Sequence, residues 1–128
     1  MFKISKQSDY GLLLLGYLRD KKDYIALSEI VEKVKLPKRF LARIASLLVR
    51  NGIIKSFEGK KGGYQIINKA LRTNLYDYLS IFEKKLSFLP CSDECRCQKS
   101  CRHKDFLQEK LDKVFINSLK KIKIKNIL

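Results

Sequence analysis

Four cysteines and the only histidine of this 128-residue chain lie between positions 91 and 103. They are arranged as C-x3-C-x-C-x3-C-x-H, which comprises Cys91, Cys95, Cys97, Cys101 and His103. So dense a group is typical of a metal-ligand set, whereas scattered cysteines usually pack as small apolar side chains. Thiolates are soft ligands, so the candidate groups are an iron–sulfur cluster, zinc or copper(I).

Two other interpretations of the cysteines are a redox-active dithiol and inert or disulfide-bonded residues. The chain contains no C-x-x-C motif, and no βαβ pattern surrounds the cysteines, which argues against a thiol oxidoreductase. No apolar run approaches the roughly 20 residues of a membrane span, and the first residues open into a helical pattern instead of a signal peptide. We therefore expect a cytoplasmic protein that is not an enzyme and not membrane-bound, in a compartment where disulfides are rare.

The charge of the chain favours nucleic acid as a partner. Lys and Arg number 28 against 13 Asp and Glu, which gives a net charge of +15. The excess is concentrated in residues 33–61, where one acid, Glu58, stands among nine bases: Lys33, Lys35, Lys38, Arg39, Arg43, Arg50, Lys55, Lys60 and Lys61. A basic stretch of this kind is the electrostatic footprint of a nucleic-acid-binding surface.

The apolar pattern of the first half predicts three helices and a hairpin. Stripes at helical spacing indicate helices over residues 5–19, 27–34 and 37–50, with Ser5 and Ser28 as N-caps of the first two and Pro37 in the first turn of the third. Residues 53–57 and 64–67 read as two short strands around a glycine-rich loop that carries Lys60 and Lys61. This order predicts a mainly α protein with a winged helix-turn-helix.

The third predicted helix separates into two faces. At 100° per residue, Arg39, Arg43, Ser46 and Arg50 share one narrow arc, and Phe40, Leu41, Ile44, Leu47 and Leu48 lie opposite. Such a helix enters the major groove while the wing reaches the neighbouring backbone. The alternative is a three-helix core whose basic face is merely solvated. The predicted DNA-binding residues are Ser28, Lys38, Arg39, Arg43, Ser46, Arg50, Lys60 and Lys61.

The second half of the sequence predicts an assembly region. An amphipathic helix should follow the cap candidates Thr73 and Asn74, with apolar positions from Leu75 to Leu86. The cysteine segment has little helical pattern and is predicted to be a loop. A long final helix is predicted from the apolar positions Leu107, Leu111, Val114, Phe115, Leu119 and Ile122. A long apolar stripe has little to cover in so small a chain, which favours pairing with a second copy. We expect a DNA-binding region over residues 1–70 and, over residues 71–128, the cluster loop and the dimerisation helices. The two regions should form one compact unit, and the basic tail at 120–125 should fray.

Three short motifs and the cysteine group together carry a family resemblance. They are ISKQSDYG at 4–11, NGII at 51–54 and GGY at 62–64. They resemble the Rrf-type (IscR/NsrR-like) iron–sulfur winged-helix transcriptional regulators over nearly the whole chain, and the opening motif is most similar to the SUF-assembly and nitric-oxide-sensing branches. The chain departs from these relatives at Glu58, where many carry arginine, and at Ala42, where the biogenesis regulator has a base-reading glutamate. The departure at Glu58 bears on the wing's minor-groove contact, and that at Ala42 implies a different or looser sequence preference.

The resemblance implies a cluster of the 2Fe-2S or 4Fe-4S type held by three regularly spaced cysteines. Cys91 and Cys101 frame that set, and either Cys95 or Cys97 completes it, because five residues separate Cys91 from Cys97 and five separate Cys95 from Cys101. The nitric-oxide-sensing branch implies that Asp9 supplies an oxygen ligand from the partner subunit; from the residues alone, Asp9 is only a carboxylate near a helix N-terminus. The resemblance favours His103 less, since relatives place a ligand histidine one position further on.

Together these features predict a homodimeric, cluster-dependent DNA-binding transcriptional regulator. We expect a repressor that binds a palindromic double-stranded operator and senses iron–sulfur status, nitric oxide or redox state. The alternative is a constitutive nucleic-acid-binding protein with a zinc staple.

Overall fold

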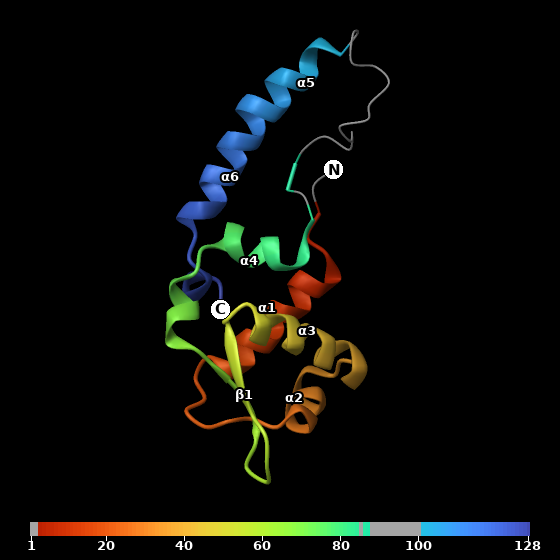
Figure 1. The fold of residues 1–128 in the computed structure, drawn as a ribbon, viewed down its shortest axis with the longest axis vertical. Coiled ribbons are helices and arrows are strands. Elements are labelled where there is room, and N and C mark those ends of the chain that lie inside the picture. The colour runs from red at the N-terminus through yellow and green to blue at the C-terminus, as the bar shows by residue number, and fades with distance from the viewer. Residues whose placement is uncertain (1–2, 85, 88–100) are drawn as a thin grey trace.

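The computed structural model of the protein describes residues 3–84, 86–87 and 101–128. Cys91, Cys95 and Cys97, three of the predicted metal ligands, lie outside these ranges. Figure 1 shows a helical body with a β-hairpin at one end and a long helix rising from the other. None of the helices within the described ranges is both long enough and apolar enough to cross a bilayer.

The three predicted N-terminal helices are present as α1 (Lys6–Leu18), α2 (Leu27–Val34) and α3 (Lys38–Arg50). Ser5 caps α1 as predicted, since its side chain accepts from the Ser8 N–H. The predicted cap of α2 is wrong: Ala26 occupies the N-cap position and Ser28 lies inside the first turn. The apolar stripe begins at Leu27, so helical backbone already holds Ser28 and its hydroxyl cannot cap from there.

The hairpin is the predicted wing. Strands β1 (Ile54–Phe57) and β2 (Gly63–Ile66) pair antiparallel, with Ile54 opposite Ile66 and Phe57 opposite Gly63. Ile25 adds a third extended segment, because its N–H donates to Tyr64 O at 2.9 Å and its carbonyl accepts from Tyr64 N–H at 2.8 Å. Gly63 has a φ of +151°, and a Cβ there would lie 2.2 Å from Ile25 O, so this crossing requires glycine.

The second half begins with the short 3₁₀ helix η1 (Asn68–Arg72) and then α4 (Leu75–Phe82). Asn74 caps α4 as predicted by accepting from the Asp77 N–H. The amphipathic pattern predicted a longer helix: α4 ends at Phe82, although Leu86 beyond it is still buried. Hydrophobic periodicity reports burial and does not require that the backbone remain helical.

The long final helix starts earlier than its apolar stripe and runs from Arg102 to Lys121. It consists of α5 (Arg102–Phe106), the π-helical turn η2 (Leu107–Leu111) and α6 (Asp112–Lys121), and the 3₁₀ turn η3 (Ile124–Asn126) follows. The expectation that the tail frays is wrong. Ile124 is buried, its N–H donates to Thr73 O at 2.9 Å, and Leu75 N–H donates to Ile122 O at 2.8 Å.

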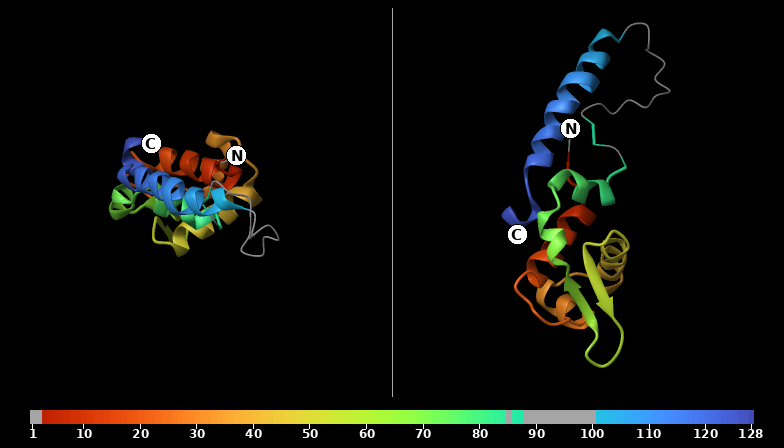
Figure 2. Two further views of the ribbon diagram at one scale, coloured as in Figure 1. Left: turned by 90° about the horizontal axis from the view of Figure 1, so that it is seen from above. Right: turned by 60° about the vertical axis from the view of Figure 1, so that its left-hand side comes forward.

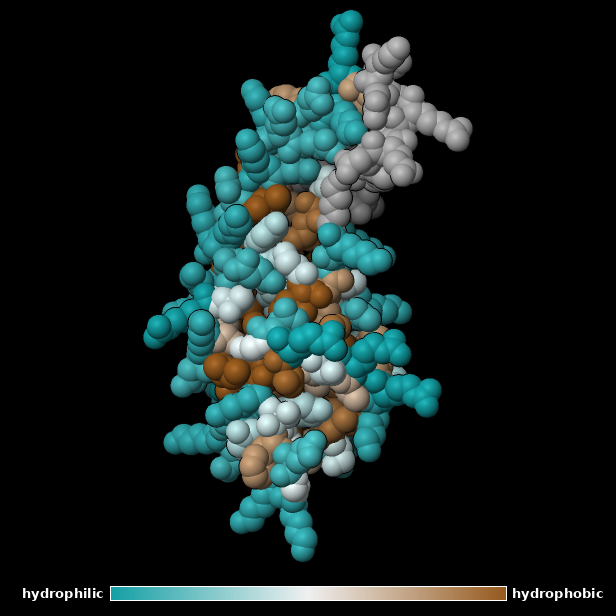
Figure 3. All heavy atoms as spheres, in the orientation of Figure 1, coloured by the Kyte–Doolittle hydropathy of each residue, from teal (hydrophilic) through white to brown (hydrophobic). Residues whose placement is uncertain are grey.

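One hydrophobic core joins the two halves of the chain. Leu14 and Leu18 of α1 and Ile44 and Leu48 of α3 are fully buried, as the predicted stripes require, and Tyr78 and Leu79 of α4 and Leu119 of α6 belong to the same cluster. The right-hand view in Figure 2 shows α4, in green, between the winged body and the long helix. On the face drawn in Figure 3, hydrophobic side chains gather over the middle of the molecule and hydrophilic ones over its lower tip.

Candidate nucleic-acid interface and metal-binding residues

The basic arc of α3 faces outward. Arg39, Arg43, Ser46 and Arg50 are all exposed, whereas Leu41 and Ile44 on the opposite side are fully buried. The ring of Phe40 packs edge-on against that of Tyr10, with centroids 5.5 Å apart, which fixes the start of α3 against α1. The helix therefore presents three guanidinium groups on a surface that the other described residues do not cover.

The tight connection from α2 to α3 determines how α3 is presented. Lys35 has a φ of +55°, in the left-handed region, and its N–H donates to Val31 O. This is the usual way to end a helix abruptly, although glycine normally occupies such a position. Pro37 then precedes α3 directly, so the two helices are separated by only three residues. Ser28 and Lys38, both predicted to bind DNA, are exposed on α2 and at the start of α3.

The wing carries its predicted lysines and an aromatic pair that sequence reasoning missed. Lys60 and Lys61 are exposed in the turn. Phe57 is 56% exposed, and its ring lies 5.5 Å from that of Tyr24, over which Lys55 Nζ lies at 5.7 Å. Strand alternation could have found half of this pair: Ile54 points inward, so Lys55 and Phe57 must share the outer face, but no such pattern places Tyr24 beside them.

At the other end of the molecule, Cys101 begins the long helix and faces His103. Cys101 Sγ lies 3.4 Å from His103 Nε2. Ligands of a tetrahedral ion with metal–sulfur and metal–nitrogen bonds of about 2.3 and 2.05 Å lie about 3.5 Å apart, so this thiol and imidazole have a spacing that one metal ion could accept. Among the described residues no group of three His, Cys, Asp or Glu side chains is arranged to hold a metal. The donor chemistry of Cys101 and His103 nevertheless fits iron or zinc.

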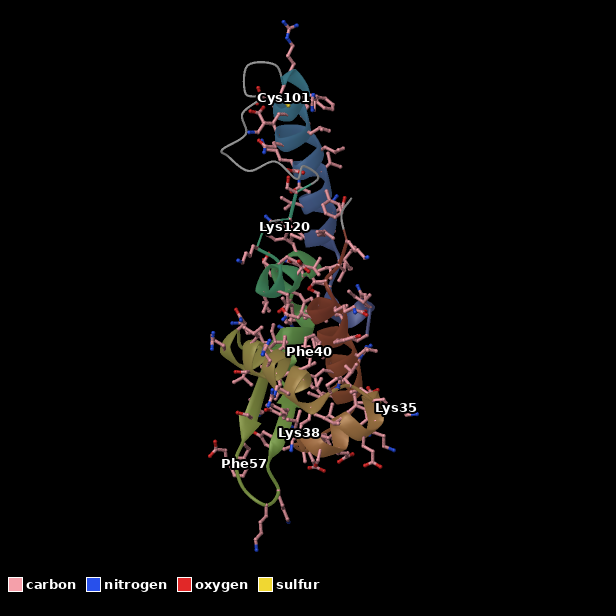
Figure 4. All side chains as sticks on the ribbon, turned by 90° about the vertical axis from the view of Figure 1, so that its right-hand side faces the viewer. Lys35, Lys38, Phe40, Phe57, Cys101 and Lys120 are labelled. Atoms are coloured by element: carbon pink, nitrogen blue, oxygen red, sulfur yellow. The ribbon has the colours of Figure 1, made fainter. Side chains whose placement is uncertain are left out.

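Asp9, the predicted oxygen ligand, is exposed in the first turn of α1. It lines a hollow of about 330 Å³ together with Leu12, Leu13, Gly16, Ile127 and Leu128. Figure 1 shows that α1 lies in the winged body, whereas the helix that begins after Cys101 rises away from it. Figure 4 likewise shows Cys101 at the opposite end of the molecule from Lys38 and Phe57. One subunit therefore does not bring Asp9 and Cys101 together.

The sequence as a whole identifies the family. Residues 4–128 match the profile described as "Rrf2: Iron-dependent Transcriptional regulator". The chain belongs to the Rrf2 family. Rrf2 proteins are transcriptional regulators and not enzymes, so the family resemblance and the expected absence of catalysis are both confirmed.

Individual relatives agree with this membership in the Rrf2 family. An HTH-type transcriptional regulator of Aquifex aeolicus is 28% identical over 83 residues, which are 64% of this chain and 58% of the relative, so the match spans less than two thirds of that protein. The structure of CymR, described as the global cysteine regulator of B. subtilis, superimposes with a TM-score of 0.74 at 20% identity, over 99% of this chain and 96% of CymR. T. potens IscR gives a TM-score of 0.65 at 21% identity, over 98% and 85%. These likenesses confirm the winged-helix fold.

Proposed function

We propose that this Rrf2-family chain is a homodimeric repressor that binds a palindromic operator in a cluster-dependent manner. The observation that carries the proposal is the exposed arc of Arg39, Arg43 and Arg50 on α3, opposite a fully buried face. Arginine is the side chain best suited to bidentate contacts with guanine in the major groove. Lys60 and Lys61 at the wing tip then bind backbone phosphates and set the position of the domain without reading bases.

The long helix supports the dimer. Leu111 and Val114 lie one turn apart and are 38% and 65% exposed, and Phe106 is 58% exposed. Large apolar side chains at such spacing are characteristic of a helix that a second helix covers. A two-fold dimer places two recognition helices about 34 Å apart, the separation of successive major grooves on one face of DNA.

For the metal, we propose that Cys91, Cys101, one of Cys95 and Cys97, and Asp9 of the partner subunit hold an iron–sulfur cluster. When bound, the cluster would supply an iron whose oxygen ligand is weakly held and therefore open to nitric oxide, oxygen or loss of iron. The separation of Asp9 from Cys101 within one subunit supports a site built by two chains. Asp9 would then tie α1 of one winged domain to the long helix of the other. Altering that tie would change the spacing of the recognition helices.

The test combines colour with DNA binding. Anaerobically purified protein should be brown, contain iron and sulfide, and bind its operator with an affinity that differs by about 5- to 150-fold between the cluster-loaded and metal-free forms, the usual size of a coupling between two sites. Cys101→Ala should remove the colour, and Asp9→Ala should keep the fold but make the cluster more labile. Colourless protein with one zinc per subunit and metal-independent DNA binding would refute the proposal and favour the zinc-stapled alternative.

A further inference from the structure

The carboxylate of Glu83, at the end of α4, is hydrogen-bonded to the start of α1. Glu83 Oε1 accepts two hydrogen bonds, from the Ser5 backbone N–H at 3.0 Å and from Ser8 Oγ at 2.9 Å. Ser8 is fully buried and Glu83 is half-buried. Partial burial by itself raises the pKa of Glu83, but the hydrogen bonds from Ser5 and Ser8 outweigh it and hold the pKa below its ordinary value. The carboxylate therefore prefers this site in its charged form.

A second contact, one turn earlier on α4, reinforces the first. The hydroxyl of Tyr78, a fully buried residue, donates to Ser8 O at 2.6 Å. The two helices can approach so closely because residue 11 is glycine: a Cβ there would lie 2.3 Å from Tyr78 Oη and 3.2 Å from Phe82 Cζ. The start of α1 is thus held by three hydrogen bonds, at a point where the two helices pack too closely for a side chain at residue 11. We call Ser5, Ser8, Tyr78 and Glu83 the α1–α4 clasp.

Along the chain, the residues of the clasp adjoin both predicted parts of the metal site. Glu83 is the C-cap of α4, and the chain leaves it toward the cysteine segment. Ser8, on the other side, directly precedes Asp9. Four residues beyond Glu83, Ser87 Oγ donates to Asp112 Oδ2 of α6 at 2.7 Å, which ties this stretch of chain to the long helix. A movement of the long helix relative to the winged body therefore reaches Glu83 through Ser87, only four residues further along the chain.

Hydrogen bonds to a carboxylate are roughly twice as strong as those between two neutral groups. Packed helices do not deform continuously but change between discrete arrangements. A clasp made of such bonds either holds the start of α1 in register with α4 or releases it. Since α1 packs on α3 through the Tyr10–Phe40 contact, release alters the presentation of the basic arc.

We propose that Glu83 is a positioning residue that transmits the state of the cysteine segment to the winged domain within one subunit. This inference rests on the proposed function, because it assumes that the state of the cysteine segment controls DNA affinity. It assigns Glu83 no ligand role: its carboxylate acts through Ser5 and Ser8. The route is separate from the one through the partner's α1.

The experiment measures the operator affinity of the full-length protein in its cluster-loaded and metal-free forms and takes the ratio of the two. This ratio is compared among the wild type, Glu83→Ala, Glu83→Gln and the control Asp20→Ala. Asp20 is an exposed acid just beyond the other end of α1, so its removal changes the charge equally. Glu83→Gln keeps an oxygen that accepts both hydrogen bonds. We expect the wild-type ratio of about 5- to 150-fold in Glu83→Gln and Asp20→Ala, and a ratio within about twofold of unity in Glu83→Ala, with an unchanged visible spectrum.

The possible failures are distinguishable. A wild-type ratio in Glu83→Ala overturns the inference about Glu83 and leaves the proposed function intact. A ratio of unity in the wild type overturns both. If Glu83→Ala does not fold, amide hydrogen exchange of the metal-free Ser8→Ala and Glu83→Gln variants tests the clasp instead. Ser8→Ala lacks one hydrogen-bond donor, so the amides of the first turn of α1 should exchange faster than in the wild type. In Glu83→Gln these amides should be as protected as in the wild type. Equal protection in Ser8→Ala would overturn the clasp.

Discussion

The close approach of α1 and α4 makes Gly11→Ala an informative perturbation. In an exposed helix this change stabilises by about 1 kcal/mol, because alanine is the better helix former. At position 11 the new Cβ would lie 2.3 Å from Tyr78 Oη, so the tyrosine must move and its hydrogen bond to Ser8 O is lost. Overpacking costs about 1–3 kcal/mol, and a buried hydrogen bond contributes about 1 kcal/mol. We expect a net loss of about 2 kcal/mol in the free energy of unfolding.

The second variant, Tyr78→Phe, removes the atom that collides. The next atoms from the added Cβ are Phe82 Cζ at 3.2 Å and Tyr78 Cζ at 3.4 Å, so a shift of a few tenths of an ångström suffices. Tyr78→Phe alone should cost about 1 kcal/mol for the lost hydrogen bond. In that background Gly11→Ala should cost little, since the helix propensity gained offsets the remaining crowding. The two changes should therefore be non-additive by about 1–2 kcal/mol, in favour of the double variant.

Urea unfolding of the metal-free protein measures the free energies of the wild type, both single variants and the double variant. All four are compared at one protein concentration, because the stability of the proposed dimer would depend on it. Gly16→Ala is the matched control: it lies on the same helix with nothing within 4 Å of the added Cβ, and it should stabilise. Additive effects of Gly11→Ala and Tyr78→Phe, or a Gly11→Ala variant as stable as Gly16→Ala, would refute the close approach of α1 and α4.

Four further outcomes are expected. Arg43→Ala should weaken operator binding by about 1–3 kcal/mol and binding to random DNA much less; equal losses in a fluorescence-anisotropy titration would make it a phosphate contact. Lys60→Ala should weaken all sequences alike and lower the slope of log affinity against log salt by about one, and an unchanged slope would exclude a backbone contact. Lys35→Gly should raise the free energy of unfolding by up to about 1 kcal/mol, because the φ of +55° strains a side chain but not glycine, whereas Lys33→Gly inside α2 should lower it. Glu83 has a lowered pKa in the folded protein, so its contribution to stability is complete above its ordinary pKa of 4.5 and is lost as the pH falls through the folded value. In an acid titration, Glu83→Gln should therefore lose less stability below pH 4.5 than the wild type does. Identical curves for the two proteins would contradict the clasp.

The sequence predicted the winged half well because local patterns determine it. Helical stripes place Leu14, Leu18, Ile44 and Leu48 in the core without any knowledge of their partners. The turn between the strands is likewise determined by adjacent glycines. The arc of arginines on α3 follows from the same periodicity, since the residues opposite a buried face must be exposed.

The contacts that the sequence did not predict join distant residues. Glu83 binds Ser5 across 78 positions and Tyr78 binds Ser8 across 70, and no local pattern marks either pair. The docking of Ile124 beside Thr73 is of the same kind. The π-helical turn has no composition of its own, so the stripe of the last helix was read as continuous α-helix.

The long helix has two sections with different surroundings, and this difference bears on how a signal could reach DNA. Leu119 is buried in the core beside α4, whereas Leu111 and Val114, closer to Cys101, are exposed. In the proposed dimer, the first section of the helix belongs to the interface and the last to the winged body of its own subunit.

A change at the cysteine segment can then act across the interface through Asp9 of the partner subunit, or within the subunit through Glu83. The two routes meet at the first turn of α1, where Ser8 and Asp9 are neighbours. Asp9→Ala should interrupt only the first route and Glu83→Ala only the second. Because Glu83→Ala alone is expected to abolish the difference between the loaded and metal-free forms, the two routes are expected to act in series, and Asp9→Ala alone should abolish it as well. A difference that survives Asp9→Ala would show that the route through Glu83 suffices by itself.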